Sequence, residues 1–322
     1  MALELKKAQR AKAKLKLGIS APSGGGKTLG ALLIAYGLVK EKHPGFSDSE
    51  VWEKVAIIDT ENGSGELYVG KEFPSITIGE YNAVTLKPPF DADKYTDSIH
   101  LCQKAGMEVC IIDSATHLWA GDGGLLQKQG EIAKRTGNSY TAWRDITPQH
   151  NRFVETMLQC DMHIIATMRS ETDYVQEKGP DGKTTIRKLG LAPIQKKGME
   201  YEFTLFLDIN SEHEAFASKD RTSIYDQRTF IITTDVGSTL MRWLESGTDG
   251  AKQVVATDVH QASAVVAYKT FVKEVYGKAS ESQKKEMEAL WKKYDDEGNP
   301  NKIKSEGSQE EVIQKMKEII GE

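Results

Sequence analysis

The sequence is poor in the features that mark secreted, membrane-spanning or zinc-binding proteins. It has only three cysteines in 322 residues, and Cys102, Cys110 and Cys160 show no Cys-x-x-Cys spacing. No run of 18 apolar residues occurs, and no hydrophobic signal segment follows the first methionine. These absences predict reduced, buried thiols without a disulfide or a zinc site, no membrane association and a cytoplasmic location.

Several enzyme signatures are also absent. The seven histidines form no His-Glu-x-x-His cluster, and no Gly-x-Ser-x-Gly nucleophile turn occurs, which disfavours metallopeptidases and serine hydrolases. No Asn-Lys-x-Asp segment is present to read guanine, so ATP is the default nucleotide if the chain binds one. The net charge of -5 does not by itself indicate a nucleic-acid-binding protein. Evidence for such binding must therefore come from local clusters of basic residues.

One short segment does carry a specific chemical signature. Ala21-Pro22-Ser23-Gly24-Gly25-Gly26-Lys27-Thr28 follows the P-loop pattern, with Ala in place of the first Gly. Glycines allow successive backbone N–H groups to wrap around phosphate oxygens, and Lys27 would reach the outer phosphates while Thr28 ligates Mg²⁺. We therefore predict a phosphate-binding loop formed by Ser23, Gly24, Gly25, Gly26, Lys27, Thr28 and Leu29.

Two acidic residues follow short apolar segments. Asp113 ends the run 109–112, which suits a residue that holds Mg²⁺ directly or through a water molecule. Glu61 lies just beyond the run 55–58, at the end of a strand where open α/β sheets bind their ligands. Glu61 is therefore a candidate to activate water, although a solvated loop acid fits the sequence as well.

Apolar runs alternate with helical periodicity through the first two thirds of the chain. This alternation predicts an α/β fold with a mostly parallel central sheet and helices on both faces. The expected strands are Lys14–Ser20, Val55–Ile58, Val109–Ile112 and His163–Thr167, followed by the β-rich segments Tyr201–Ile209, Ala215–Ser218 and Thr229–Thr233. The expected helices are Thr28–Val39, Asp93–Ala105 and Tyr140–Gln159.

The composition changes after Ser246-Gly247 to Lys, Glu, Ala and Gln with helical periodicity. We therefore expect a basic N-terminal segment over residues 1–14, an α/β core over 15–245 and a small helical C-terminal domain over 246–322. The N-terminal segment is either a solvated leader or an arm that contacts phosphates. Its basic residues are Lys6, Lys7, Arg10, Lys12 and Lys14, and Lys16 lies just beyond it.

A second basic segment is predicted to form a projecting hairpin. Residues 174–177 and 184–188 flank the turn sequence Gly179-Pro180-Asp181-Gly182. Four basic residues and one tyrosine that can stack on a base make it a candidate surface for single-stranded DNA: Tyr174, Lys178, Lys183, Arg187 and Lys188. The hairpin also carries several acidic residues, so a surface hairpin with scattered charge is an equally open interpretation.

Four segments resemble the motifs of the RecA family. Ile57-Ile58-Asp59-Thr60-Glu61 resembles that family's strand ending in Asp-x-Glu, which implies that Glu61 is the general base. Ile111-Ile112-Asp113-Ser114 resembles its Walker B segment, and Thr167-Met168-Arg169 stands where the family places a γ-phosphate sensor. Lys219-Asp220-Arg221 resembles the Lys-Asn-Arg segment that enters a neighbouring subunit's site, with Asp in place of Asn. The resemblance implies that Lys219 and Arg221 act in trans, whereas an exposed turn of charges is the alternative.

Together with the segments 140–143 and 195–203, these motifs make the chain similar, over about Leu15 to Leu244, to phage-encoded RecA-like nucleotide-binding proteins. Some of those proteins act in single-strand annealing and recombination. The resemblance implies a RecA-like P-loop core, ATP and Mg²⁺, DNA-stimulated hydrolysis, single-stranded DNA, a filament or ring of identical subunits, and contact with a single-strand-binding or replication protein. The alternative is an ATP-switched assembly module with negligible turnover. A small-molecule kinase would leave Glu61 and the basic hairpin unexplained.

Overall fold

The computed structural model describes residues 7, 9–178, 184–248, 271–272, 275–277, 279–294, 299–300 and 306–320; the side chains of residues 172–190 and 306–310 lie outside this description. The chain divides into two compact units, residues 1–250 and 251–322. Among the described residues, no helix is both long enough and apolar enough to cross a membrane.

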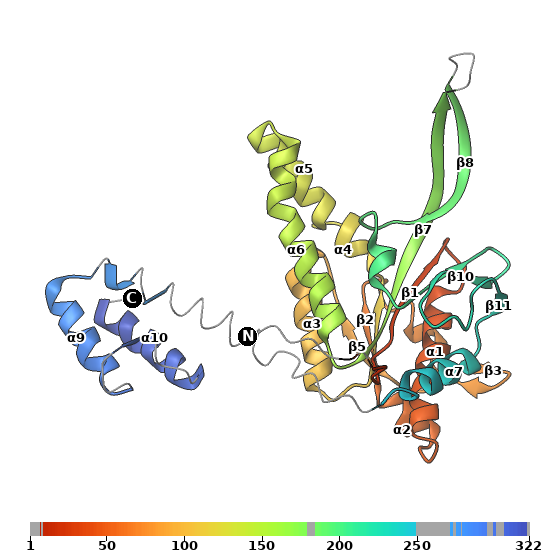
Figure 1. Ribbon diagram of the computed structural model, residues 1–322, viewed down its shortest axis with the longest axis horizontal. Coiled ribbons are helices and arrows are strands. Elements are labelled where there is room, and N and C mark those ends of the chain that lie inside the picture. The colour runs from red at the N-terminus through yellow and green to blue at the C-terminus, as the bar shows by residue number, and fades with distance from the viewer. Residues whose placement is uncertain are drawn as a thin grey trace. The chain divides into compact units, whose positions relative to one another are not determined.

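The first unit is built on one twisted sheet, with β1 near its middle (Figure 1). The strand order is β11-β10-β9-β1-β7-β6-β2-β5, with β8 paired to β7. The six strands from β9 to β5 are parallel, and β10 and β11 are antiparallel additions. The strands are β1 (Lys16–Ala21), β2 (Val55–Asp59), β5 (Asn82–Thr85), β6 (Val109–Asp113), β7 (His163–Lys178), β8 (Thr184–Pro193), β9 (Leu205–Ile209), β10 (Glu214–Asp220) and β11 (Thr229–Ile231).

Helices cover both faces of this sheet because its central strands are apolar on both sides. Ile57 and Ile111 pack into the cluster formed with α1 (Lys27–Lys42) and α7 (Thr234–Glu245). Their neighbours Ile58 and Ile112 pack into the opposite cluster, formed with α3 (Ala92–Lys104) and α6 (Ser139–Gln159). The predicted fold class is therefore confirmed.

The helices α1 and α7 approach each other closely through glycine. A Cβ on Gly37 would lie 2.0 Å from the Thr234 carbonyl oxygen, and a Cβ on Gly237 would lie 2.1 Å from that of Ile34. Backbone contact of this kind excludes any side chain. It clamps α1, whose first turn carries the P-loop residues, against the C-terminal helix of the first unit.

The structure corrects several predicted boundaries. β7 does not end at Thr167: it continues to Lys178, so the fourth strand and the first arm of the hairpin are one element. Residues 199–202 form the 3-10 helix η2 (Met199–Glu202) instead of a strand, and β9 begins only at Leu205. Gly198, at φ +92°, starts that turn, which the apolar character of the segment did not reveal.

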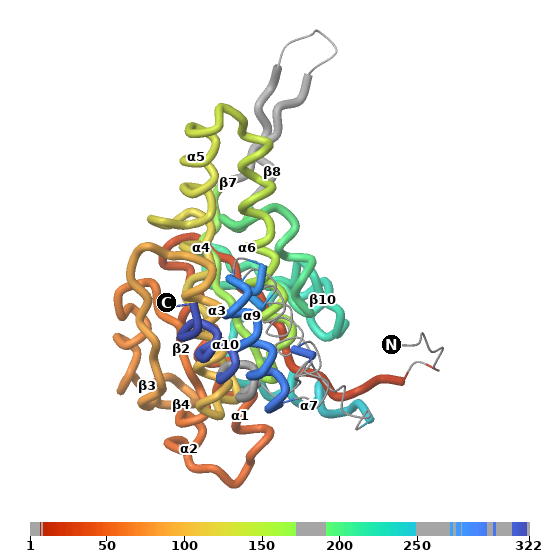
Figure 2. The backbone as a smooth tube through the Cα atoms, turned by 90° about the vertical axis from the view of Figure 1, so that its left-hand side faces the viewer, coloured from red at the N-terminus to blue at the C-terminus, as the bar shows by residue number. Residues whose placement is uncertain are grey.

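Other elements had no prediction from the sequence. They are α2 (Asp48–Trp52), η1 (Glu66–Tyr68), β3 (Glu72–Phe73), β4 (Ile76–Thr77), β5, α4 (Thr116–Ala120), α5 (Leu125–Thr136) and α7. Figure 2 shows α5 and α6 running side by side. Short, polar strands such as β5 lack the apolar run that identifies the central ones.

The described part of the basic N-terminal segment packs on its own unit. Arg10 lies 4.2 Å from the centre of the Trp243 ring and donates to that residue's carbonyl oxygen. Lys12 pairs with Glu245 at 3.1 Å, and the ammonium of buried Lys16 donates to the carbonyl oxygens of Cys160 and Met162. These three basic side chains therefore have their partners within the first unit. Neither the interpretation as a solvated leader nor that as a phosphate-contacting arm predicted these contacts.

The second unit has a small core of its own. Its described helices are α9 (Glu281–Trp291) and α10 (Glu306–Ile320), and Ser280 begins α9 with a capping box to Gln283. Met287, Leu290 and Trp291 pack with Val312 and Met316. The helical character expected for the C-terminal region is present in both described helices.

Candidate nucleotide-binding site

The P-loop connects β1 to α1 at the carboxyl edge of the parallel sheet. Gly24 (φ +77°) and Gly26 (φ +89°) adopt left-handed conformations that favour glycine. A Cβ on Gly25 would lie 2.9 Å from the methyl carbon of Ala21, the residue that stands where the motif has its first Gly. Gly26 begins α1 without a side-chain cap, so the N-terminal N–H groups and the positive end of the helix dipole are available to an anion.

Lys27 lies across this loop. Its ammonium donates to the carbonyl oxygens of Ala21 (3.2 Å) and Pro22 (3.1 Å). Burial lowers the pKa of Lys27, while the charges of Asp113 and Glu61 oppose that shift. The side chain is thus placed over the same cradle as the glycines, as the motif predicts.

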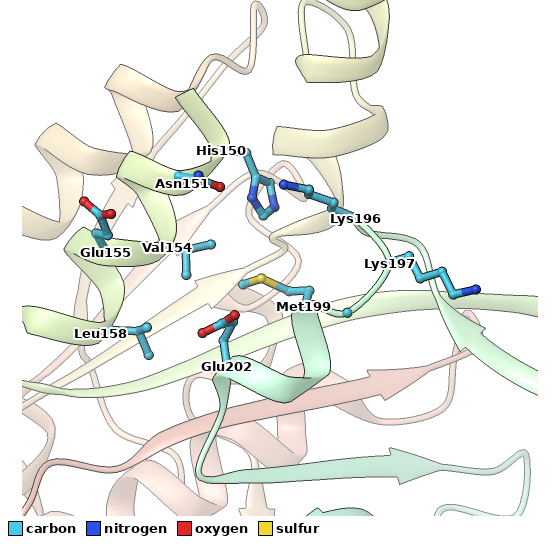
Figure 3. Close-up of a pocket in the computed structure, with 10 residues that line it drawn as sticks. His150, Asn151, Val154, Glu155, Leu158, Lys196, Lys197, Met199 and Glu202 are labelled. Atoms are coloured by element: carbon cyan, nitrogen blue, oxygen red, sulfur yellow. The ribbon is translucent and has the colours of Figure 1, made fainter. Parts of the chain in front are cut away.

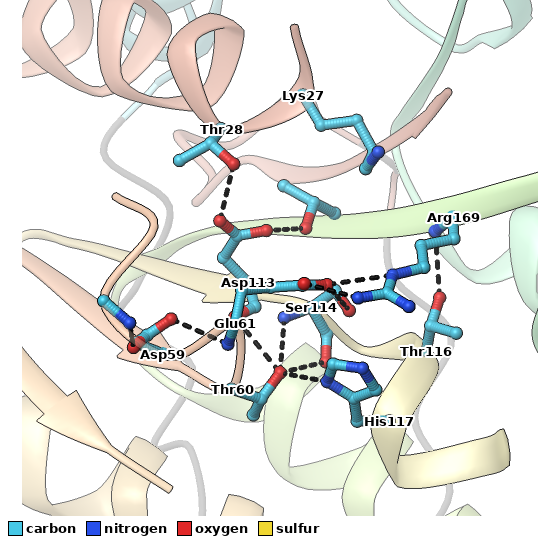
Figure 4. Close-up of polar contacts among 12 residues, drawn as sticks. Lys27, Thr28, Asp59, Thr60, Glu61, Asp113, Ser114, Thr116, His117 and Arg169 are labelled. Atoms are coloured by element: carbon cyan, nitrogen blue, oxygen red, sulfur yellow. Dashed lines mark hydrogen bonds and ion pairs between the residues drawn. The ribbon is translucent and has the colours of Figure 1, made fainter. Parts of the chain in front are cut away.

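Asp113 accepts hydrogen bonds from two threonines at the centre of the site (Figure 4). Thr28 Oγ1 donates to its Oδ2 at 2.7 Å, and Thr167 Oγ1 donates to its Oδ1 at 2.5 Å. Burial raises the pKa of Asp113 above its ordinary value, and these two hydrogen bonds act in the opposite direction.

The donor set at Thr28 and Asp113 suits Mg²⁺. The described residues contain no group of three or more His, Cys, Asp or Glu side chains that would form an all-protein metal cage. Mg²⁺ prefers one or two protein oxygen ligands together with substrate phosphates and waters. A hydroxyl and a carboxylate oxygen 2.7 Å apart, beside a phosphate cradle, fit that requirement.

Glu61 lies on the loop after β2 and is held from two sides. The side chain of Asp59 accepts from the backbone N–H groups of Glu61 (2.8 Å) and Gly63 (2.6 Å), which fixes the loop. Arg169 on β7 contacts the Glu61 carboxylate through two nitrogens, at 3.1 and 2.5 Å, and Ser114 Oγ donates to it at 3.2 Å. Burial alone would raise the pKa of Glu61, but the hydrogen bond and charge of Arg169 outweigh it, so the pKa is lowered.

Several polar residues around Glu61 were not predicted. Thr60 Oγ1 accepts a hydrogen bond from the Ser114 N–H at 2.8 Å and lies 2.7 Å from Nδ1 of His117. The imidazole ring of His117 stacks on the ring of Phe90. The imidazole of His213 lies against Gly26. Thr60 could have been found from its place inside the Asp-Thr-Glu segment, but no spacing pattern points to the two histidines.

Lys219 and Arg221 lie away from their own P-loop. In the sheet register, Lys219 of β10 lies opposite Phe206 of β9, and Phe206 lies opposite Gly18 of β1. Gly18 is three residues before the end of β1 at Ala21, where the P-loop begins. The Arg221 N–H donates to the Thr204 carbonyl oxygen, nearer still to the opposite edge of the sheet. β10 ends at Asp220, one residue before Arg221, and has an irregularity between residues 217 and 219, so Lys219 and Arg221 do not share one regular extended segment.

Two acidic residues that lie close to these cations in the sequence bond elsewhere. Asp220 accepts from the backbone N–H groups of Thr222 and Tyr225, and Glu214 accepts from the Asn210 side chain. The ammonium of Lys219 donates to the carbonyl oxygen of Tyr201 instead.

The predicted DNA-contacting residues are on the β7–β8 hairpin. In the backbone register Tyr174 pairs with Lys188, Val175 with Arg187, and Lys178 with Thr184. Lys183 lies outside the described residues, and the side chains of the other four lie outside the described part of the structure. Because β7 is continuous, Tyr174 and Arg169 belong to one strand.

A glycine cradle, an overlying lysine and a half-buried Thr28–Asp113 pair at the carboxyl edge of a parallel sheet define a P-loop ATPase. More particularly, the chain belongs to the AAA domain family, whose profile matches residues 13–239. No curated protein matches the chain. Among solved structures, a KaiC-like protein from the hyperthermophilic archaeon Pyrococcus horikoshii OT3 is similar at a TM-score of 0.37 and 14% identity, over 67% of this chain and 84% of that one. No conclusion about this chain rests on that likeness.

Proposed function

We propose that this protein binds ATP with Mg²⁺ and hydrolyses it in response to single-stranded DNA, as a phage-encoded protein of recombination or replication. The observation that carries the proposal is the convergence of Lys27, Thr28, Asp113 and Glu61 at one edge of the sheet. A phosphate cradle alone would serve binding. A carboxylate beside it adds the means to activate water.

The roles of the residues follow from their positions. Lys27 and the N–H groups of the loop would bind the outer phosphates, and Thr28 and Asp113 would hold Mg²⁺, which when bound neutralises phosphate charge. The Glu61 carboxylate would accept a proton from the attacking water. Arg169, two residues after Thr167 on β7, would neutralise charge that develops on the γ-phosphate.

The coupling to DNA rests on the continuity of β7. A ligand that moves the hairpin acts on the strand that also carries Thr167 and Arg169, and these residues contact Asp113 and Glu61. Single-stranded DNA is the ligand that the basic residues and Tyr174 favour. Binding at the hairpin would therefore change the partners of the catalytic carboxylate.

Assembly into a ring or filament of identical subunits is the third part of the proposal. The register of β10 directs Lys219 and Arg221 toward the edge of the sheet opposite their own P-loop. Arg221 so placed would reach a neighbouring subunit's nucleotide, and Lys219 would join it by exchanging its hydrogen bond to the Tyr201 carbonyl oxygen. A single-strand-binding or replication protein would then act as a further partner on the same DNA.

One observation favours a second function, an ATP-switched assembly module of DNA metabolism with negligible turnover. Arg169 occupies both oxygens of Glu61 and lowers its pKa against the effect of burial, which weakens the carboxylate as a base. If DNA does not release this contact, the protein would bind ATP and change its assembly without turning over.

The test is single-turnover hydrolysis by Glu61→Gln, with Glu66→Gln in the same loop as the matched control. Glu61→Gln should bind ATP normally and hydrolyse it at least about 100-fold more slowly in the presence of single-stranded DNA. Glu66→Gln should behave as wild type. Unchanged hydrolysis in Glu61→Gln would assign the base elsewhere, and a wild-type protein that binds ATP without turnover, with or without DNA, would favour the assembly module.

A further inference from the structure

A cavity of about 320 Å³ lies outside the nucleotide-binding site, between the second half of α6 and the segment that follows β8 (Figure 3). Val154 and Leu158 of α6 line one side, and Met199 of η2 lines the other. A volume of this size lies at the lower end of the range for small-molecule sites. The cavity therefore has room for a compact ligand with an apolar surface.

A buried histidine supplies the polar feature of this cavity. His150 is only 4% exposed, and neither of its ring nitrogens meets hydrogen-bond geometry with a partner among the described residues, although the side chain of Gln195 lies close enough to raise its pKa. Buried polar groups are nearly always paired, because an unpaired one keeps the full cost of its lost hydration. Trp119 packs edge-on against the ring at 5.7 Å and leaves the ring nitrogens unpaired.

The imidazole of His150 is neutral at physiological pH. Burial, and then the charge of Lys196, lower its pKa to about 4, with Gln195 acting in the opposite direction. A neutral imidazole offers one N–H donor and one acceptor nitrogen. A ligand that satisfies both must itself offer an acceptor and a donor.

The charged residues around the cavity cancel. Lys196 and Lys197 line it together with Glu155 and Glu202, and Asn151 adds an amide. Two cations against two anions do not select an anionic phosphate or a carboxylic acid. The lining instead fits an uncharged ligand with apolar faces and a polar edge that carries both donors and acceptors.

We infer that this cavity receives one base of single-stranded DNA bound along the hairpin. A nucleobase is uncharged, has two apolar faces and carries donors and acceptors on its edge, and unstacked bases are recognised by stacking on aromatic rings, including histidine, and by hydrogen bonds to that edge. The cavity follows the hairpin directly, because β8 ends at Pro193 and the lining segment begins at Lys196. The inference rests on the proposed binding of single-stranded DNA.

The inference separates the contribution of bases from that of the phosphate backbone. The affinities of the full-length protein for oligo(dT) and for an abasic oligomer of the same length are measured in wild type, His150→Phe, Val154→Phe and Lys134→Met. His150→Phe removes the hydrogen bonds to the base edge and Val154→Phe fills the space for the base, so each should lower the preference for oligo(dT) over the abasic oligomer about 10-fold. Affinity for the abasic oligomer should stay the same in these two variants, and Lys134→Met, at an exposed lysine on α5, is the control that should keep the wild-type preference.

A direct readout accompanies these affinities. An oligomer with a single 5-iododeoxyuridine is expected to cross-link to the peptide that contains Met199 in wild type, and not in Val154→Phe, where the larger side chain fills the cavity. An unchanged preference and unchanged cross-linking in folded variants would overturn the cavity assignment while leaving DNA binding intact. If wild type binds neither oligomer, the proposed function itself is wrong. Should His150→Phe fail to fold, Val154→Phe and the cross-link decide the question.

Discussion

Arg169 and Glu61, 108 positions apart in the chain, form a two-point ion pair in which Nε lies 3.1 Å from Oε1 and Nη2 lies 2.5 Å from Oε2. The pair joins β7 to the loop after β2, across the intervening strand β6. The nearby P-loop therefore faces a carboxylate whose position and ionisation both depend on one arginine.

Arg169→Gln should bind ATP normally but lose about 100-fold in DNA-stimulated turnover, because a charge aimed at the transition state is removed. Without Arg169, only the weaker effects of His117 and of the Ser114 hydrogen bond oppose burial, so the pKa of Glu61 rises. Since the base works only when ionised, the acid limb of the single-turnover rate should move to higher pH. Arg152→Gln, which breaks an exposed pair with Asp93 at 2.8 Å, is the control and should change neither property. An acid limb that stays in place would separate Arg169 from Glu61 in function.

Lys27→Ala should abolish measurable ATP binding while leaving the thermal unfolding midpoint unchanged. Lys27 supplies charge to the phosphate cradle, and its ammonium bonds only to two carbonyl oxygens of the loop, so its removal leaves the core intact. Lys40→Ala removes a lysine from the same helix, where it bonds to the Phe46 carbonyl oxygen far from the loop. Calorimetric titration with ATP compares the two, and wild-type affinity in Lys27→Ala would contradict the P-loop assignment.

Charge reversal at Lys183 and Arg187 should weaken the binding of single-stranded DNA and flatten its dependence on salt. A phosphate that the protein no longer neutralises keeps its counterion, so the slope of log affinity against log salt falls by about 0.7 for each such phosphate. Reversal of Lys292 and Lys293, exposed at the end of α9, alters net charge equally and serves as the control. The hairpin would be excluded as a DNA surface by equal affinities and equal slopes in the two reversed proteins.

Subunits of Arg221→Ala and Lys27→Ala should each be inactive alone and regain activity when mixed. Some interfaces then pair an intact P-loop with an intact Arg221 from a neighbour. A residue supplied across an interface is worth about 10³ to 10⁵ in rate in other NTPases, so rescue is easily detected in a titration of one variant into the other. Mixed oligomers that form but never hydrolyse ATP would show that Arg221 does not act in trans.

His163→Asn should make the free energy of unfolding less sensitive to acid. His163 Nδ1 accepts the Leu15 N–H at 3.0 Å, and burial lowers the pKa of this histidine to about 3. Between about pH 6.5 and 3, His163 is therefore protonated in the unfolded chain but stays neutral in the folded chain. The free energy of unfolding falls as the pH falls through that window. From pH 7 to 5 this amounts to about 2 kcal/mol.

Asparagine retains an acceptor for the Leu15 N–H and does not titrate. Urea unfolding at pH 7 and 5 measures the difference, and an equal loss of stability in wild type and His163→Asn would place the acid sensitivity in other groups.

The sequence alone was sufficient for the features that depend on neighbours in the chain. The P-loop is eight consecutive residues, and its glycine conformations, its lysine and its threonine follow from that local order. Asp113 and Glu61 were found because each stands at or just beyond the end of an apolar strand, and apolar strands buried on two faces are recognisable in one dimension.

Only the tertiary structure decided which of these residues meet. The pairings of Arg169 with Glu61 and of Thr167 with Asp113 depend on β7 lying next to β6, and that of Thr60 with His117 depends on β6 lying next to β2. Strand order in a sheet leaves no local mark in the sequence. The register of β10, which turns Lys219 away from its own P-loop, is likewise set by pairing with β9 and an irregularity in the strand. Local periodicity specifies which faces of a strand are buried, whereas neighbours and register are chosen by packing between segments distant in the chain.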